Sequence, residues 1–359
     1  MEDKIEKKAK RGRFRIWKLL LGIILAVIIL LGAGLLWLTL GEYKPESVET
    51  LDKPGGTRQL DLSETLTVVS FNIGYAALGE DADFFLDGGK TTMPEDASVV
   101  KTNIEGIENT LLDLDADVYL IQEVDTDSKR TFGIDEAKCL KDALKTPYSF
   151  ALNYSADFVP YPIPGMLGKV HSGLAVYTDL EVSESTRIQL PITFSWPIRC
   201  INLKRCLLVN RVPAENGKEL VLVNLHLEAY DSGEGKLAQT KQLFDFLSAE
   251  VTKGNYVIVG GDFNQTFPGA KLFDPIFEGC WEPGVIDEAL PEGMSFVFDA
   301  EEPTCRLLNV PYKGNDNPMY YIIDGFMVSS NVKVESFEVV DTGFVYSDHR
   351  PIKLTVSFE

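Results

Sequence analysis

Side chains able to do acid–base or metal chemistry stand in short apolar segments along this sequence. The segments are rich in Val, Ile, Leu and aromatic residues, a composition typical of strands. The polar residues they contain or end on are Asn72, Glu123, His226, Asp262, Asn264 and Asp324, with Asp348 and His349 just before the last segment. Strand ends are held by a rigid scaffold. We therefore expect these residues to meet in one site.

These residue types indicate a particular chemistry. Carboxylate and amide oxygens are hard ligands that suit Mg²⁺ or Mn²⁺ better than zinc. The imidazoles of His226 and His349 exchange protons near neutral pH. Asp324 lies within an apolar run, where a carboxylate must be paired, hydrogen-bonded or linked to a metal. The alternatives without a catalytic role are that Asp348-His349 is simply a polar loop and that His226 is a core histidine whose hydrogen bonds are all made within the fold.

The strands and helices that must position these residues do not alternate regularly along the sequence. We expect strands over 66–72, 117–124, 148–153, 172–178, 205–212, 219–228, 255–264, 320–328, 332–340 and 351–358. Apolar spacing predicts helices over 98–112, 135–144 and 234–250. Several neighbouring strands have no helix between them. The pattern favours an α/β fold of two packed mixed or antiparallel sheets flanked by helices, rather than a wound parallel sheet.

The N-terminus predicts a membrane anchor. Residues 1–18 hold eight basic residues and three acidic ones, and residues 19–40 carry no charge. A 22-residue helix is roughly 33 Å long, enough to cross a bilayer. A cleaved signal peptide is the alternative, but its apolar region is shorter. We expect a cytoplasmic basic tail, a single transmembrane helix, a polar tether over 41–65 and a catalytic domain over 66–359 outside the membrane.

Charge bears on the partners of the outer part. The chain has 34 basic and 54 acidic residues, and removing the eight and three of the first 40 leaves 26 and 51, a net charge of −25. Nucleic-acid surfaces normally show a basic footprint, so nucleic acid is disfavoured as a partner, although a local basic patch would still permit it. Five cysteines without a CxxC pattern indicate thiols rather than a disulfide framework, with Cys200 and Cys206 the one pair that could form.

Seven motifs occur in order between Leu66 and Phe358: SFNIG, LIQEVD, HSGLAVY, NLHLEA, GGDFNQ, IIDGF and SDHRP. Together they resemble the endonuclease/exonuclease/phosphatase superfamily, which has the deoxyribonuclease-I-like fold. The resemblance implies a four-layer sandwich with a Mg²⁺-dependent site at one edge. It also implies that a phosphate ester is the substrate and that the enzyme is a hydrolase.

The resemblance also implies residue roles. Glu123 would be the principal metal ligand, with Asn72 and Asp348 near the metal or its waters. Asp262 and Asn264 would position the attacking water and a phosphate oxygen. His349, oriented by Asp324, and His226 would serve the phosphate and the proton transfers, and which imidazole does which is left open.

Departures from the family pattern narrow the subfamily. Abasic-site endonucleases have tyrosine at the position of His226 and an acid soon after the first asparagine, where this chain has Ile73 and Gly74. Inositol polyphosphate 5-phosphatases carry Asn-Tyr-Arg after the GD element, where Asn264 is followed here by Gln265. Neither substrate class is supported.

Three long connections, 76–96, 154–170 and 193–205, are predicted to form the substrate surface. Their aromatic and proline residues could bind a ring or lipid face beside a phosphate, or simply pack on the sandwich. His171 and Lys169 are candidate phosphate-binding residues. We expect a phosphoesterase acting on a lipid headgroup, an envelope polymer or a small organic phosphate. The alternatives are an extracellular nuclease and a non-catalytic scaffold.

Overall fold

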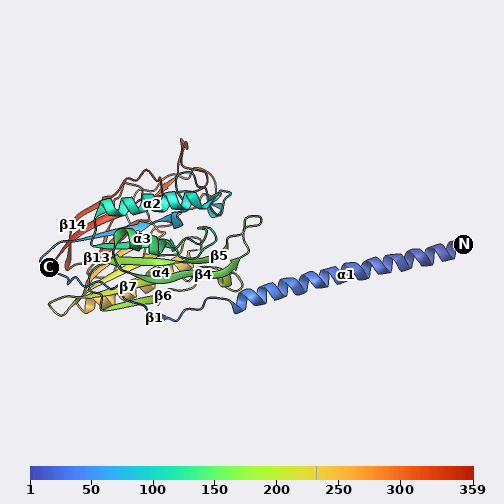
Figure 1. Cartoon of the computed structure of the whole chain (residues 1–359), viewed down its shortest axis with the longest axis horizontal. Helices are drawn as coiled ribbons and strands as arrows, with labels where there is room; N and C mark the ends of the chain where they lie inside the picture. The colour runs from blue at the N-terminus through green and yellow to red at the C-terminus, as the bar shows by residue number, and fades with distance from the viewer. Residues whose placement is uncertain (232) are drawn as a thin grey trace.

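The computed structural model describes residues 1–231 and 233–359, and the side chains of residues 2–4 and 7–12 lie outside the described set. Five basic residues of the predicted tail are therefore not described beyond their backbone: Lys4, Lys7, Lys8, Lys10 and Arg11. A long helix, α1 (Glu2–Leu40), projects from a domain built on two sheets (Figure 1).

The two sheets are mixed, as the sequence predicted. In each, one pair of strands is parallel, β2 with β3 and β8 with β9. The seven-stranded sheet has the order β1 (Val48–Thr50), β6 (Glu184–Gln189), β7 (Cys206–Pro213), β8 (Glu219–His226), β9 (Tyr256–Asp262), β13 (Asp324–Ser329), β10 (Met294–Val297). The six-stranded sheet has the order β14 (Val332–Val339), β15 (Ile352–Phe358), β2 (Leu66–Asn72), β3 (Val118–Asp125), β5 (Gly168–Thr178), β4 (Tyr148–Val159).

Helices cover the outer faces of the sheets. The helices of the domain are α2 (Ala97–Leu114), α3 (Glu136–Leu144) and α4 (Glu234–Thr252), with short 3₁₀ turns η1 (Gly74–Ala76), η2 (Phe85–Asp87) and η3 (Ile198–Ile201). One apolar core lies between the sheets, a second joins α2 and α3 to the six-stranded sheet, and a third joins α4 to the seven-stranded sheet. The predicted four-layer sandwich is confirmed.

The apolar part of α1 is exposed along its length. The stretch Arg13–Leu40 is long and apolar enough to cross a membrane, and none of its most apolar window is buried against the domain. A helix that is apolar on all faces is stable in lipid rather than in water. The structure thus provides one candidate membrane span, at the N-terminus.

The segment 41–65 is packed on the domain rather than being the polar tether that the sequence predicted. β1 pairs with β6 at the edge of the seven-stranded sheet, with Glu49 opposite Arg187. Leu60 is buried in the core between the sheets. The sequence predicted a linker here because turn-forming residues surround isolated apolar ones. In the structure, β1 and Leu60 nevertheless pack on the two sheets.

The predicted strand over 320–328 is divided in two. β12 (Tyr320–Tyr321) pairs with β11 (Cys305–Arg306) in a separate two-stranded sheet, and β13 begins only at Asp324. Thr304 Oγ1 accepts hydrogen bonds from the backbone N–H groups of Ile323 and Asp324, at 3.1 Å each, where the chain changes sheets. The five cysteines are free thiols, so Cys200 and Cys206 form no disulfide.

Candidate active site

Strand register brings three of the predicted site residues to one edge of the seven-stranded sheet. His226 ends β8 directly opposite Asp262 at the end of parallel β9. Asp324 begins β13 and lies opposite Asp262 on its other side. The other sheet contributes Asn72, whose Nδ2 donates to Asp262 Oδ2 at 3.1 Å. Asp262 therefore lies at the centre of the site and joins the two sheets.

Asn264 follows β9 with a φ of 50°, a left-handed conformation that asparagine tolerates better than most residues. Its backbone N–H donates to Asp262 Oδ1 at 2.8 Å, and its Nδ2 donates to the Leu227 carbonyl at 2.9 Å. The turn thus fixes one oxygen of Asp262 while Asn72 holds the other.

Glu123 is directed into the site by an irregularity of β3. The pairing of β3 with β5 shifts register between Ile121 and Val124, and Glu123 has a φ of 58°. A bulge of this kind turns one side chain away from the regular alternation. Glu123 Oε1 consequently lies 3.8 Å from His226 Nε2, across the gap between the sheets.

Asp348 and Asn72 approach each other through the turn at Gly74. Asn72 Oδ1 accepts from the Gly74 N–H at 3.1 Å, and Ser347 Oγ donates to the Asn72 carbonyl at 2.9 Å. Gly74 has a φ of 54°, and a Cβ there would lie 2.7 Å from Asp348 Oδ1. Glycine is therefore required for Asp348 to reach its place beside Asn72.

The pKa values of the two histidines of the site are shifted in opposite directions. Burial lowers the pKa of His349, but the charge of Asp324, whose Oδ2 is 2.9 Å from His349 Nδ1, outweighs it and raises the pKa well above the ordinary value. Burial and the nearby charges of Arg205 and His349 lower the pKa of His226 well below its ordinary value. The geometry thus distinguishes two imidazoles that the sequence could not.

Burial raises the pKa values of two carboxylates of the site. Burial, and next the charge of Asp348, raises the pKa of Glu123 to about 8. Burial also raises the pKa of Asp262 to about 7, although His349 opposes the shift. Crowded, desolvated carboxylates are stabilised by a bound cation, and oxygen donors of this kind fit Mg²⁺ or Mn²⁺. The residues present therefore fit the predicted metal.

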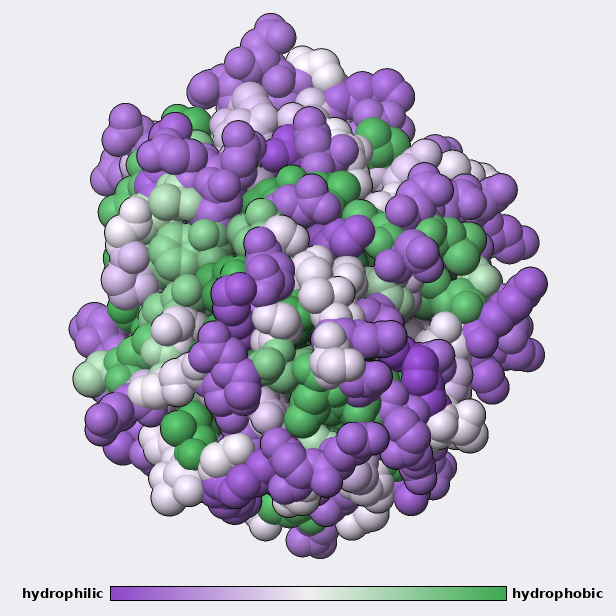
Figure 2. Space-filling model, turned by 90° about the vertical axis from the view of Figure 1, so that its left-hand side faces the viewer, coloured by the Kyte–Doolittle hydropathy of each residue, from purple (hydrophilic) through white to green (hydrophobic). Residues whose placement is uncertain are grey.

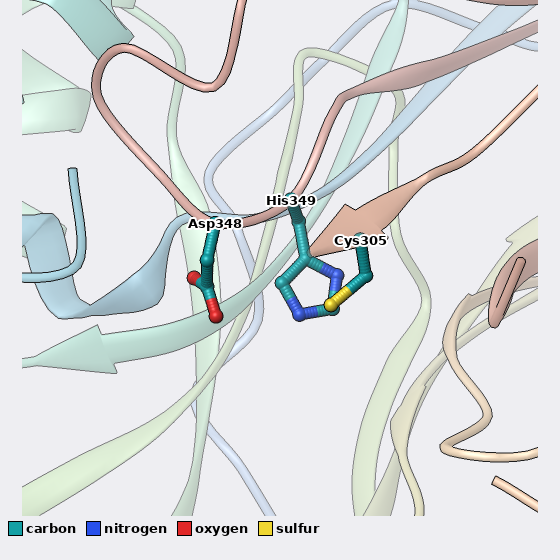
Figure 3. A group of neighbouring side chains, drawn as sticks. All are labelled: Cys305, Asp348 and His349. Atoms are coloured by element: carbon teal, nitrogen blue, oxygen red, sulfur yellow. The ribbon is translucent and has the colours of Figure 1, made fainter. Parts of the chain in front are cut away.

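Two groups of potential ligands bring their donor atoms within 4.8 Å of one another in the described part of the chain. They are Cys305 with Asp348 and His349, and Asp262 with Asp324 and His349. In the first, shown in Figure 3, the carboxylate and the sulfur lie on either side of the imidazole. Burial raises the pKa of Cys305 to about 12, so its protonated thiol is a poor ligand for a hard cation. Its position follows from the β-bridge between Cys305 and His349.

Glu123 is the ligand that the family resemblance placed first, together with Asn72 and Asp348. Glu123 belongs to neither set. The assignment of the metal to these three residues stays a prediction. Their ligand atoms are all oxygens, which favours them over the group that contains the Cys305 thiol.

His171 and Lys169 lie apart from this cluster on β5. His171 Nδ1 is 2.6 Å from Thr126 Oγ1, and the backbone N–H of His171 donates to Ser128 Oγ. Lys169 forms an ion pair with Asp127 on the surface. Neither residue lines the pocket that contains the site carboxylates, and their predicted binding of substrate phosphate stays a prediction.

Sequence reasoning missed three buried arginines that line the pocket: Arg130, which pairs with Asp125, and Arg205 and Arg306. Arg205 Nη1 donates to the His226 carbonyl at 3.3 Å, and Arg306 Nη2 donates to the Gly79 carbonyl at 2.7 Å. Among the described residues, no hydrogen-bond acceptor is found for Arg205 Nε or for Arg306 Nε and Nη1. Arg205 is the last residue of the connection 193–205, which the sequence predicted as substrate surface, and this position could have identified it. Arg306 had no such signal.

A pocket of about 550 Å³ opens onto the cluster. Glu123, His226, Asp262, Asp348 and His349 line it together with the three arginines. All three connections predicted as substrate surface contribute to its wall, mostly with apolar side chains: Leu78, Phe84, Phe85, Leu86, Val159, Tyr161, Phe194, Ile198 and Leu203. The pocket therefore has a polar floor and an apolar wall.

Comparison with solved structures agrees with this architecture. The crystal structure of TDP2 from Caenorhabditis elegans is similar with a TM-score of 0.52 and 17% identity, over 83% of this chain and 75% of that one. An endonuclease/exonuclease/phosphatase from Beutenbergia cavernae gives 0.53 and 18%, over 82% and 72%. The human Nocturnin catalytic domain gives 0.51 and 17%, over 84% and 97%. At such identities the likeness shows the fold alone.

No curated protein matches the chain by sequence. The model of the Endonuclease/Exonuclease/phosphatase family matches residues 70–349, from the end of β2 to the second site histidine. That range contains the strand ends of both sheets that meet around Asp262. The chain belongs to the Endonuclease/Exonuclease/phosphatase family.

Proposed function

We propose that this protein is a divalent-metal-dependent phosphoesterase whose catalytic domain lies outside the cytoplasmic membrane, to which α1 anchors it. The observation that carries the proposal is the convergence of Glu123, Asp262 and Asp348 with His226 and with His349, which pairs with Asp324, on the floor of one pocket. Hydrolysis of a phosphate ester needs a cation, a positioned water and a proton donor. These residue types can supply all three.

Glu123, Asn72 and Asp348 would hold the metal, which when bound neutralises charge on the phosphoryl oxygens. Asp262 is placed to orient the attacking water, because both of its oxygens are fixed by Asn72 and Asn264. His349, kept charged by Asp324, faces the same floor and provides positive charge or a proton. The guanidinium groups of Arg205 and Arg306, which line the pocket, match phosphate oxygens.

The test is hydrolysis of bis-p-nitrophenyl phosphate by the full chain in detergent micelles, with Mg²⁺, Mn²⁺ or chelator. We expect turnover that needs the metal, and Glu123→Gln should lower kcat/KM by at least about 100-fold, because loss of even an outer-sphere partner costs about 10–100-fold. Glu215→Gln, at an exposed position of the β7–β8 turn, is the matched control. Turnover that survives chelation would reject the proposal.

The same assay separates the nuclease alternative, because plasmid DNA and RNA can replace the small diester. A net charge of −25 outside the first 40 residues disfavours a polyanion. We therefore expect nucleic acid to be a poorer substrate than a small phosphodiester at physiological salt.

A further inference from the structure

The end of the anchor is fixed to the rim of the active-site pocket. Trp37, in the last turn of α1, lies 6.4 Å from Phe158 on β4, measured between ring centroids. Trp196 Nε1, in the connection before η3, donates to Thr39 Oγ1 at 3.1 Å. The helix therefore leaves the domain between β4 and η3, the two elements that also border the pocket.

Charge pairs hold the same junction just after the helix. The Glu42 carboxylate is buried, with Oε1 3.3 Å from Lys204 Nζ and 3.2 Å from Arg199 Nε. Ile201, at the end of η3, lines both the hollow beside Trp37 and the active-site pocket. Because these contacts surround the first residues after the span, the orientation of the pocket relative to α1 is set by the fold.

The connections at this junction expose large apolar side chains. Ile163 is 75% exposed and Tyr161 56% exposed in the loop between β4 and β5, and Ile198 is 54% exposed in η3. Ile192 and Trp196 are also exposed nearby in sequence to Ile198. The loop between β4 and β5 projects on the side of the domain from which α1 leaves (Figure 1). Apolar loops beside a membrane span favour contact with the bilayer.

The opposite face of the domain differs. Figure 2 shows the side turned away from α1, where hydrophilic residues stand along most of the outline and hydrophobic ones form patches between them. The C-terminus also lies on this far side (Figure 1). The last strand, β15, starts just after His349 and ends near the C-terminus, so the site lies at the end of the sandwich nearer the anchor.

We infer that these loops rest on the bilayer that α1 spans, and that the substrate is a phosphodiester lipid of that same membrane. The inference rests on the proposed function and names its substrate class. Tyr161 and Ile198 line the pocket while being largely exposed, so they lie at its mouth. The apolar wall beyond them accommodates the glyceride or acyl part of a lipid, and the polar floor accommodates its phosphate.

The reaction adds water to phosphorus and breaks the P–O bond to one alcohol. The proton lost by the water is balanced by the one gained by the leaving alkoxide, so a lipid phosphodiester yields a phosphomonoester and an alcohol. No further reactant is needed. A lipid delivered laterally through the bilayer also avoids the repulsion that a polyanion would meet in approaching an acidic domain.

The experiment uses the full chain in nanodiscs of phosphatidylcholine, phosphatidylethanolamine, phosphatidylglycerol and sphingomyelin. Lipid products are measured by mass spectrometry, and bis-p-nitrophenyl phosphate is assayed in the same samples. The double variant Ile163→Asp/Ile192→Asp places charge on the membrane-facing loops without altering a pocket-lining residue. Val334→Asp, an exposed apolar position on β14 near the far end of the domain, is the matched control.

We expect metal-dependent lipid hydrolysis whose rate, relative to the soluble diester, falls about ten-fold or more in the double variant. Withdrawing two Ile side chains from an apolar phase costs more than the roughly 1.4 kcal/mol that a ten-fold change represents. Val334→Asp should leave the ratio unchanged. Turnover of the soluble diester without any lipid hydrolysis would overturn the inference but spare the proposed function. An unchanged ratio of lipid to diester hydrolysis in the double variant would also overturn the inference. If the unsubstituted chain hydrolysed neither substrate, both the inference and the proposed function would be rejected.

Discussion

The carboxylate of Asp262 lies between two imidazole groups. Its Oδ2 atom is 3.4 Å from His226 Nε2 and 3.8 Å from His349 Nε2. His349 has a closer carboxylate partner on its other ring nitrogen, because Nδ1 lies 2.9 Å from Oδ2 of the buried Asp324. A buried aspartate on the remote ring nitrogen fixes the orientation of an imidazole and favours its charged form. Asp324 therefore acts through His349, as a positioning residue.

At the residue scale we predict that Asp324→Asn and His349→Gln are not additive. Each should lower kcat for the soluble diester by about 10²–10⁴-fold, the usual contribution of a positioned proton-transfer group. The double variant should be no worse than His349→Gln alone, because the two side chains act as one unit. The measurement is a double-mutant cycle on kcat and KM, with Tm recorded for each variant. Multiplicative losses would show instead that Asp324 has a separate role.

The sequence allowed the positions of candidate site residues to be predicted where a motif ends a strand, and less well elsewhere. Asp262, His226 and Asn72 could be placed because strand ends meet at a common edge. The direction of Glu123 depends on a bulge, which arises from pairing with β5 and leaves no local pattern. His171 sits in a family-like motif, yet its ring contacts Thr126 rather than the site. Residue type alone does not reveal which neighbour a side chain will meet.

At the element scale, one buried carboxylate joins α4 to the seven-stranded sheet. Glu250 is 1% exposed and accepts two hydrogen bonds from Arg211 on β7, at 2.7 and 3.1 Å, and one from Asn255 Nδ2 at 2.7 Å. Burial raises the pKa of Glu250, but these bonds and the Lys253 ammonium outweigh it and lower the pKa from 4.5 to about 2. The charged form is thus bound more tightly in the folded state.

Because this pKa is depressed, the stabilisation is present above the unfolded value of 4.5 and is lost as pH falls towards about 2. We predict that Glu250→Gln lowers the free energy of unfolding by roughly 3 kcal/mol at pH 7, the usual cost of breaking a buried pair. The gap from the unsubstituted chain should narrow below pH 4.5. Denaturant unfolding of the full chain in micelles measures both quantities.

Asp245→Asn is the matched control on the same helix, since Asp245 is exposed and lies 3.9 Å from Lys241. An exposed i,i+4 pair contributes about 0.3–0.5 kcal/mol, so the control should hardly change stability. Equal losses in the two variants, or a Glu250→Gln deficit that stays constant with pH, would contradict the role given to the buried carboxylate.

At the scale of the whole molecule, the sandwich could be predicted but the junction with the anchor could not. Alternating apolar runs specified most strands and all three domain helices. No local pattern in residues 41–65 predicts that β1 adds to a sheet edge or that Glu42 is buried against Lys204. Both contacts depend on partners more than 130 residues away in the sequence. The position of the pocket relative to α1 therefore emerged only from the assembled fold.

Hydrolysis of a membrane lipid requires that the catalytic domain lie on the side of the membrane where the substrate is presented. The tail before the span carries eight basic residues and three acidic ones, and basic flanks are retained in the cytoplasm. We predict that, in a bacterial inner membrane, a C-terminal epitope on the full chain is digested by protease in intact spheroplasts while an N-terminal epitope is protected. Replacing the eight basic residues of the tail with glutamine should weaken this preference, because it removes the charge asymmetry but leaves the apolar span unchanged. A C-terminal epitope that is lost only after lysis would place the domain in the cytoplasm, and the substrate would then have to come from the inner leaflet.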